Sequence, residues 1–165
     1  MANISPEAYT TYGMLSKYDW SPSFKAALMG SIDVETGGSF DYQKKQDNGG
    51  PGRGLFQFEK KHLNDYRKYL KDNGLTDSAE NQIEFVYKNM TIDSYSKDKQ
   101  GKYVSNAPHE IGGTNRGMLQ DAMKNQDIND STESLMDDYF HSGVPHEDRR
   151  KKESEKYRKA FKIKP

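Results

Sequence analysis

Apolar side chains recur at helical spacing along much of this chain. The stretch after Asp77 repeats them at positions i, i+3, i+4 and i+7, which places them on one face of a helix: Ile83, Val86, Tyr87 and Met90. The stretch before Asp77 repeats Leu63, Tyr66 and Leu70 in a similar way. Because such faces are normally buried, both stretches are predicted to be amphipathic helices that supply the core.

Residues that cap helices mark where several helices begin. Ser5 and Ser21 each precede a proline, and Asp77 precedes Glu80 by three residues, so each pairs a capping side chain with a residue suited to the first turn. We expect helices over residues 6–17, 22–36, 58–72, 78–92, 115–125, 131–141 and 146–162. Segment 37–53, rich in glycine, and the polar segment 94–114 do not fit a helix, and the second is expected to hold a hairpin or an ordered loop. The predicted fold class is mainly α.

Length and composition fit one domain with a lean core. The chain has 165 residues, of which 32% are apolar, and its mean hydropathy is −1.10. Many of the 11 tyrosines and 7 phenylalanines are therefore expected to fill the core. We expect residues 1–20 to form a helical N-terminal extension and residues 21–165 to form the main domain, which ends in a basic helix.

Charge and cysteine content exclude several classes of protein. Lysine and arginine together number 25, as do aspartate and glutamate, so the net charge gives no sign of a nucleic-acid binder. The chain has no cysteine, which excludes disulfides and the thiol nucleophile of cysteine peptidases. No apolar run approaches the length of a membrane span, and the start MANISPEAYTTYG lacks the features of an ordinary signal peptide.

Glu35 is the main candidate for chemistry. At 100° per residue it falls about 20° from both Leu28 and Phe24 on the helical wheel, so its side chain should point to the apolar face. Apolar surroundings disfavour the charged carboxylate and favour the protonated form, which is the form that a general acid in glycoside cleavage needs. A buried glutamate at a helix end is nevertheless more often salt-bridged than catalytic. Asp33 falls on the opposite side of the helix and is expected to be a solvated charge.

Other kinds of site do not fit the sequence. The loop DNGGPGRG lacks the Lys-Ser/Thr ending of a phosphate-binding loop, and it places glycine and proline where a calcium loop needs oxygen ligands. The four histidines show no His-Glu-x-x-His spacing, which disfavours a zinc amidase. We expect no metal site and no cofactor.

Three motifs in this order resemble a known group of proteins. Glu35-Thr36-Gly37, the glycine-rich DNGGPGRG and Gly54-Leu55-Phe56-Gln57 are similar to the Glu-Ser-Gly and Gly-Leu-Met-Gln motifs of goose-type lysozymes, soluble lytic transglycosylases and phage tail lysozymes. The phage tail lysozyme family is the nearest match. Residues 81–85, and residues 139–145 with the basic helix that follows, also resemble that family. The similarity implies a mainly α, lysozyme-like single domain with a glycine-rich active-site loop or small hairpin.

The resemblance also implies roles for particular residues. Glu35 matches the catalytic glutamate, while Asp47 and Glu59 match two candidates for positioning the attacking water. Taken alone, Asp47 is more simply a turn residue and Glu59 a residue that favours a helix start. The expected substrate-binding residues, which border the matched motifs, are Thr36, Gly54, Phe56, Gln57 and His62. Phe56, which replaces the usual methionine, would stack on a sugar face or else pack inside the protein.

The implied activity is cleavage of the β-1,4 bond between N-acetylmuramic acid and N-acetylglucosamine in bacterial peptidoglycan. Two alternatives stay open: a lytic transglycosylase that acts on the same bond, and a non-catalytic virion module. Glu35→Gln is expected to abolish activity and to leave stability equal or higher. The expected setting is a phage virion, with tail or other virion proteins as partners, or the host cytoplasm before release to the cell wall. The basic segment 149–164 is either a solvated surface or a contact for an anionic wall polymer or an acidic virion protein.

Overall fold

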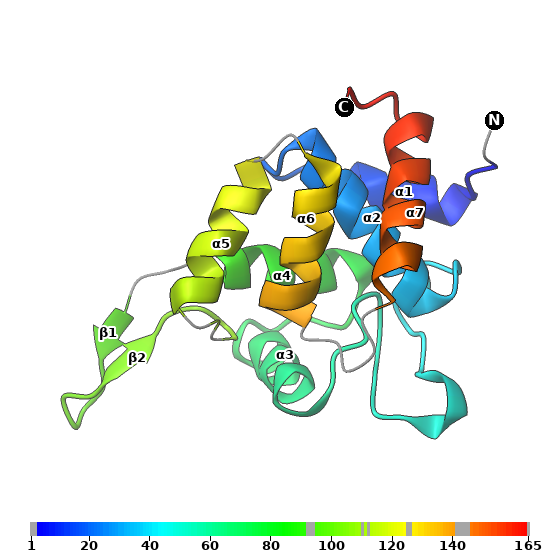
Figure 1. Cartoon of the computed structure of the whole chain (residues 1–165). Helices are drawn as coiled ribbons and strands as arrows, with labels where there is room; N and C mark the ends of the chain where they lie inside the picture. The colour runs from blue at the N-terminus through cyan, green and yellow to red at the C-terminus, as the bar shows by residue number, and fades with distance from the viewer. Residues whose placement is uncertain are drawn as a thin grey trace.

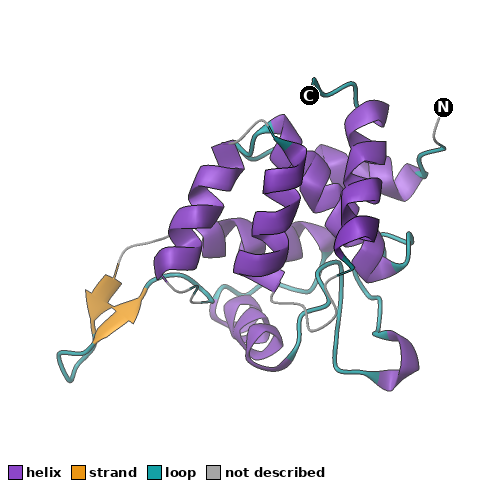
Figure 2. Ribbon diagram, viewed as in Figure 1, coloured by secondary structure: helices purple, strands orange, loops and turns teal. Residues whose placement is uncertain are grey.

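The computed structural model describes residues 3–91, 95–109, 111, 113–124, 127–140 and 146–164. The elements, in chain order, are α1 (Pro6–Leu15), α2 (Pro22–Thr36), the 3-10 turn η1 (Asp47–Gly49), α3 (Lys60–Asp72), α4 (Ala79–Thr91), β1 (Tyr95–Lys97), β2 (Tyr103–Ser105), α5 (Gly113–Lys124), α6 (Ile128–Ser134), the π-helical turn η2 (Leu135–Phe140) and α7 (Glu147–Ala160). Helices dominate, and the strands form one small hairpin at the edge of the molecule (Figure 2). The prediction of a mainly α fold is confirmed.

Helix α2 lies at the centre of the fold. Most of its side chains are buried, and it contacts α1, α5, α6 and α7. Helix α7, red in Figure 1, packs along it near the two chain termini. A helix that is buried on most sides belongs to the interior of a domain, so α2 is the element on which the others are assembled.

Helices α2 and α7 approach each other closely at Gly30. A Cβ atom built at this position would lie 2.2 Å from Oγ of Ser154 and 2.7 Å from its Cα atom. Any larger side chain would therefore have to push the α7 backbone away. The two helices can pack this closely only because residue 30 has no side chain.

Asp33 joins the same two helices, and the expectation that it is a solvated charge is wrong. The residue is only 6% exposed. Its Oδ2 atom accepts hydrogen bonds from Nζ of Lys156 at 2.8 Å and from the hydroxyl of Tyr157 at 2.6 Å. The helical wheel places Asp33 away from the face that holds Leu28 and Phe24, but it cannot show that α7 packs over that other side of α2.

The predicted helix starts are largely confirmed. The hydroxyl of Ser5 accepts a hydrogen bond from the amide of Ala8, and that of Ser21 accepts one from Phe24, each at 3.1 Å. The third cap is wrong, because Ser78, and not Asp77, accepts the amide of Asn81. The Asp77 carboxylate instead accepts hydrogen bonds from α3 and α4.

The loop regions were also located correctly. Strands β1 and β2 pair antiparallel, with Ser96 opposite Val104, inside the segment predicted to hold a hairpin or an ordered loop. The helix predicted over 131–141 is divided into α6 and η2, and α3 begins two residues later than expected. The predicted boundaries at residues 92, 94, 125 and 141 lie outside the described residues, as do residues 141–145 of the matched motif.

Helix α1 packs on the rest of the domain. It contacts α2 and α4, and its Ala8 and Leu15 side chains are fully buried in the same core. The division at residue 20 stays a prediction. Within the described part of the chain, no helix combines the length and the apolar character needed to cross a membrane.

Candidate active site

Glu35 lies in the last turn of α2, where the chain leaves the helix. Gly37 ends the helix in the left-handed conformation, with φ of 62°, and its amide bonds back to the carbonyl oxygens of Asp33 and Val34. Glycine adopts this conformation without steric cost, so the Thr36-Gly37 step fixes where the helix stops. The Glu35 side chain is thereby held at the rim of the core, 17% exposed.

The Glu35 carboxylate is paired with a buried arginine. Nη2 of Arg150 donates to Oε1 of Glu35 at 2.5 Å, and the Arg150 side chain is only 2% exposed. The guanidinium also lies over the ring of Phe140, 5.3 Å from its centroid. The expectation of purely apolar surroundings for Glu35 is therefore wrong, because the first turn of α7 brings a cation to the carboxylate.

Both members of this pair lie near helix ends. The C-terminal end of a helix carries partial negative charge and the N-terminal end partial positive charge. Glu35 lies near the C-terminal end of α2, and Arg150 lies in the first turns of α7. Each charge meets the like-signed end of its own helix, but the ion pair also brings it to the opposite-signed end of the partner helix, so the two dipole effects oppose each other.

The glycine-rich loop is folded into a compact, hairpin-like structure. Arg53 forms isolated bridges with both Lys45 and Phe58, and η1 lies at the loop tip. The Gln46 side chain accepts a hydrogen bond from the amide of Gly52 at 2.9 Å. The predicted active-site loop or small hairpin is therefore an ordered element that connects α2 to α3.

Gln82 of α4 anchors this loop. Its Oε1 atom accepts the amide of Leu55, and its Nε2 atom donates to the carbonyl oxygen of Tyr42, both at 2.9 Å. Gly54 has φ of 82°, and a Cβ atom there would lie 2.5 Å from Oε1 of Gln82. Gly54 thus allows the close backbone packing expected of it, and the Gln82 amide joins two segments of the loop to α4.

Gln82→Met tests this anchor. Methionine has a similar size but leaves the amide of Leu55 and the carbonyl of Tyr42 without these partners, so the free energy of unfolding should fall by about 2 kcal/mol. Urea denaturation measures the loss. Gln100→Met, at an exposed position of the hairpin, is the matched control and should change little. Equal stability of the two variants would contradict an anchoring role for Gln82.

One cleft of about 760 Å³ brings most of the predicted residues together. Its walls come from the end of α2, the glycine-rich loop, α3, η2 and the start of α7, and among the residues that line it are Glu35, Asp47, Phe56, Gln57, Glu59, His62, His109, His146 and Arg150. Gln57 faces it from the loop and donates to the carbonyl oxygen of Gly54 at 2.9 Å. Glu35 thus shares one cleft with both candidates for the second acid.

The two candidate second acids differ in their surroundings. Asp47 is 82% exposed and pairs with Lys44, whose Nζ atom lies 2.9 Å from its carboxylate. Glu59 is half-buried just before α3, and no hydrogen bond or ion pair joins its carboxylate to any described residue. A partly desolvated carboxylate without a partner is the better placed of the two to hold a water molecule.

His62 belongs to a hydrogen-bonded wall of the cleft. Its Nε2 atom lies 2.8 Å from the hydroxyl of Tyr139, which also accepts a hydrogen bond from Nδ2 of Asn89. Oδ1 of Asn89 accepts the amide of His109, whose ring stacks on that of His62 with centroids 4.1 Å apart. His109 in turn bonds Asp65 through Nδ1 at 2.7 Å.

Tyr139, in the hydrogen-bonded wall of the cleft, is held in its neutral form. Burial raises the pKa of Tyr139 well above its usual range. The Tyr139 hydroxyl accepts from Nδ2 of Asn89 and also lies within hydrogen-bond distance of Nε2 of His62, where the histidine tautomer decides which group donates. The His62 ring is thus fixed by its neighbours on the cleft surface.

Two of the predicted substrate-binding side chains are almost fully buried. Thr36 is 1% exposed, and its hydroxyl donates to the carbonyl oxygen of Ile32 and accepts the amide of Phe40. Phe56 is 2% exposed and stacks between Phe58 and Phe140. Both side chains are used in packing, which was the simpler interpretation of the phenylalanine.

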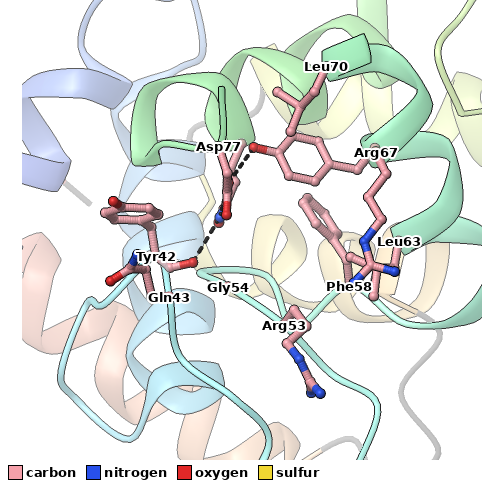
Figure 3. A pocket seen from close by; sticks show the side chains of 11 residues that line it. Tyr42, Gln43, Arg53, Gly54, Phe58, Leu63, Arg67, Leu70 and Asp77 are labelled. Atoms are coloured by element: carbon pink, nitrogen blue, oxygen red, sulfur yellow. Dashed lines mark hydrogen bonds between the residues drawn. The ribbon is translucent and has the colours of Figure 1, made fainter. Parts of the chain in front are cut away.

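A second cavity, of about 290 Å³, lies between the glycine-rich loop and helices α3 and α4. Figure 3 shows it bordered by Tyr42, Gly54, Phe58 and Asp77, with dashed lines at the Asp77 carboxylate and the Tyr42 carbonyl. The first bond comes from Tyr66 and joins α3 to Asp77 in the α3–α4 connection, and the second comes from Gln82 and ties the glycine-rich loop to α4. This cavity does not include Glu35.

Several residues of the site were not found by sequence reasoning. Arg150 was noted only as part of a basic segment, while Asn89 and His109 were not singled out. Gln82 was not singled out either, although the helix that carries it was predicted and lies in the matched segment 81–85. Among the described residues, no three acidic or histidine side chains converge as a metal site would require.

The fold and the cleft define the class of protein. A mainly helical domain, with a glutamate at the end of its central helix and an ordered glycine-rich loop across the same cleft, is lysozyme-like. A family model described as phage tail lysozyme matches residues 7–161, and the chain belongs to that family. A search of curated proteins found no match.

Proposed function

We propose that this protein is a muramidase that hydrolyses the β-1,4 bond between N-acetylmuramic acid and N-acetylglucosamine in bacterial peptidoglycan. The observation that carries the proposal is that Glu35, held by Arg150, shares one cleft with Glu59, a carboxylate that no described residue pairs with. Glycoside hydrolysis needs two carboxyl groups on either side of the bond that is cut. Membership of a lysozyme family supports peptidoglycan as the substrate.

The proposal gives each group a role. Arg150 holds Oε1 of the Glu35 carboxylate, which leaves Oε2 to take up a proton and pass it to the departing sugar oxygen. Glu59 then removes a proton from the attacking water, which adds to the sugar carbon as the glycosidic bond breaks. An inverting glycosidase needs about 6.5–9.5 Å between its two carboxyl groups, so that the water fits between them. Gln57 and His62 border the space where the sugars bind.

Mass spectrometry of muropeptides released from purified peptidoglycan tests the activity. Hydrolysis leaves reducing sugar ends, which is the expected result. Release of 1,6-anhydromuramic ends would instead identify a lytic transglycosylase. Absence of any release, from protein shown to be folded, would identify a non-catalytic virion module.

The second acid can be tested by two matched substitutions. Glu59→Gln should lower the rate of release of reducing ends by about 10²-fold or more, because a general base is lost. Asp47→Asn should change the rate little, since it removes only an exposed ion pair. A larger loss in Asp47→Asn than in Glu59→Gln would reverse the assignment.

We also propose that the protein is carried on the phage particle and contacts tail proteins. The family description, phage tail lysozyme, supports this setting. Proteomic analysis of purified virions should detect the chain in a fixed number of copies per particle. Its presence in infected cells but not in washed virions would instead identify a lysis enzyme.

A further inference from the structure

A groove of about 1,030 Å³, separate from the cleft, lies between α1 and α7. It is lined by Asn3, Ile4, Tyr9, Lys152, Glu155, Lys156, Lys159, Ala160 and Lys162, and none of these residues lines the cleft that holds Glu35. Figure 1 shows α1 and α7 next to each other near the two chain termini. We call this surface the α1–α7 groove.

Three lysines of the α1–α7 groove, Lys152, Lys159 and Lys162, have no close ion-pair partner of their own among the described residues. Lys156 is paired with Asp33 and Glu153, and Glu155 is held by two short bonds from Arg158. Lys152 and Lys162 form no ion pair with a described residue. The Lys159 side chain is 70% exposed, and its Nζ atom lies 3.8 Å from the Glu155 carboxylate, which is already bound by Arg158. The groove is therefore cationic, although the net charge of the chain is zero.

An aromatic side chain lies in the same groove. Tyr9 is 55% exposed, and its ring meets Phe161 edge to face, with centroids 5.5 Å apart. Phe161 is itself stacked on Tyr12 at 3.8 Å. A tyrosine supported in this way offers an exposed apolar surface to a ligand at low conformational cost, and a sugar ring fits such a surface.

The spacing of the lysines indicates what kind of polymer would fit. Lys152 and Lys159 are seven residues apart on α7, so they lie on the same helix face and about 10 Å apart along the axis. This distance is comparable to the length of a disaccharide. A glycan that carries a carboxylate on every second sugar would therefore meet successive lysines while one of its rings packs on Tyr9.

We propose that the α1–α7 groove binds a second, non-reacting stretch of peptidoglycan strand, through the carboxylates of its peptide substituents and through one sugar ring. This proposal rests on the proposed function for the identity of the polymer. The groove would hold the protein on the wall while the cleft acts on another part of the network. The catalytic residues take no part in this contact.

The test is a binding measurement that does not depend on cleavage. Glu35→Gln protein is co-sedimented with purified sacculi from which teichoic acid has been removed, with and without three added substitutions, Lys152→Gln, Lys159→Gln and Lys162→Gln. The groove variant should bind about tenfold more weakly. A matched control carries Lys71→Gln, Lys99→Gln and Lys124→Gln, which change the net charge equally at exposed positions outside the groove. The control should bind like the parent protein.

Tyr9→Ser tests the contact with the sugar ring separately from the charges of the lysines. It should weaken binding several-fold at moderate salt, with an unchanged circular dichroism spectrum. Equal binding by the groove and control variants would overturn the proposal, as would binding seen only when teichoic acid is left on the sacculi. Since the assay uses an inactive variant, a failure of the proposed activity is seen separately, as absence of cleavage by the wild-type protein.

Discussion

Glu35→Gln is expected to lower the rate of peptidoglycan cleavage by about 10²–10⁴-fold, which is the contribution typical of a general acid. Glutamine can still accept the hydrogen bond from Arg150, but it has no proton to give to the departing sugar. The measurement is the release of reducing ends from purified peptidoglycan. Glu80→Gln, at an exposed position in the first turn of α4, is the matched control and should retain full activity.

The structure also changes the expected effect of Glu35→Gln on stability. Sequence reasoning expected equal or higher stability, because it placed the carboxyl group in apolar surroundings. Since the Arg150 guanidinium is buried against Glu35, removal of the negative charge should instead lower the free energy of unfolding by about 1–3 kcal/mol. Full activity in the variant would end the proposed role of Glu35, and a gain in stability would contradict the importance of the ion pair.

Arg150→Met is expected to lower the free energy of unfolding by about 3 kcal/mol at neutral pH. The change leaves the Glu35 carboxylate, only 17% exposed, without its partner, and removal of one member of a buried pair is far more costly than removal of both. Chemical denaturation measures the effect. Arg149→Met, at the exposed neighbouring position, should change stability by much less.

A double-mutant cycle separates the pair from other effects. If loss of the ion pair causes the destabilisation, the double variant Glu35→Gln/Arg150→Met should lose less free energy of unfolding than the two single variants lose together. The difference should be about 1 kcal/mol or more. Additive losses would mean that Arg150 acts mainly through its packing on Phe140. Arg150→Lys keeps the charge but cannot keep the planar guanidinium geometry, so it should fall between wild type and Arg150→Met.

Most of the fold could be predicted because it follows from local chemistry. Ser5 and Ser21 cap the helices that they were expected to cap, and the apolar stripe that contains Ile83 and Met90 is buried. The Asp77 cap failed for a tertiary reason, because the hydroxyl of Tyr66 and the amide of Gln82 take up its carboxylate. A single sequence gives no sign of such a competing partner.

The candidate site was predicted less completely, because its contacts join distant parts of the chain. The matched motifs placed Glu35, Gln57 and Glu59 on what proved to be one cleft. Arg150 lies 115 residues after Glu35, and no local pattern distinguishes it from the other cations of α7. The same applies to the Asn89–Tyr139 contact, which spans 50 residues.

The pairing of Glu35 with Arg150 also has a consequence for the order in which the site can be assembled during translation. Glu35 is synthesised 115 residues before Arg150, and α7, which carries Arg150, covers α2 at Gly30. Until α7 has been made and has docked, the Glu35 carboxylate lacks its Arg150 partner. The face of α2 that α7 covers then stays exposed. A ribosome that stops before α7 should therefore release a product in which the Glu35–Arg150 ion pair cannot form.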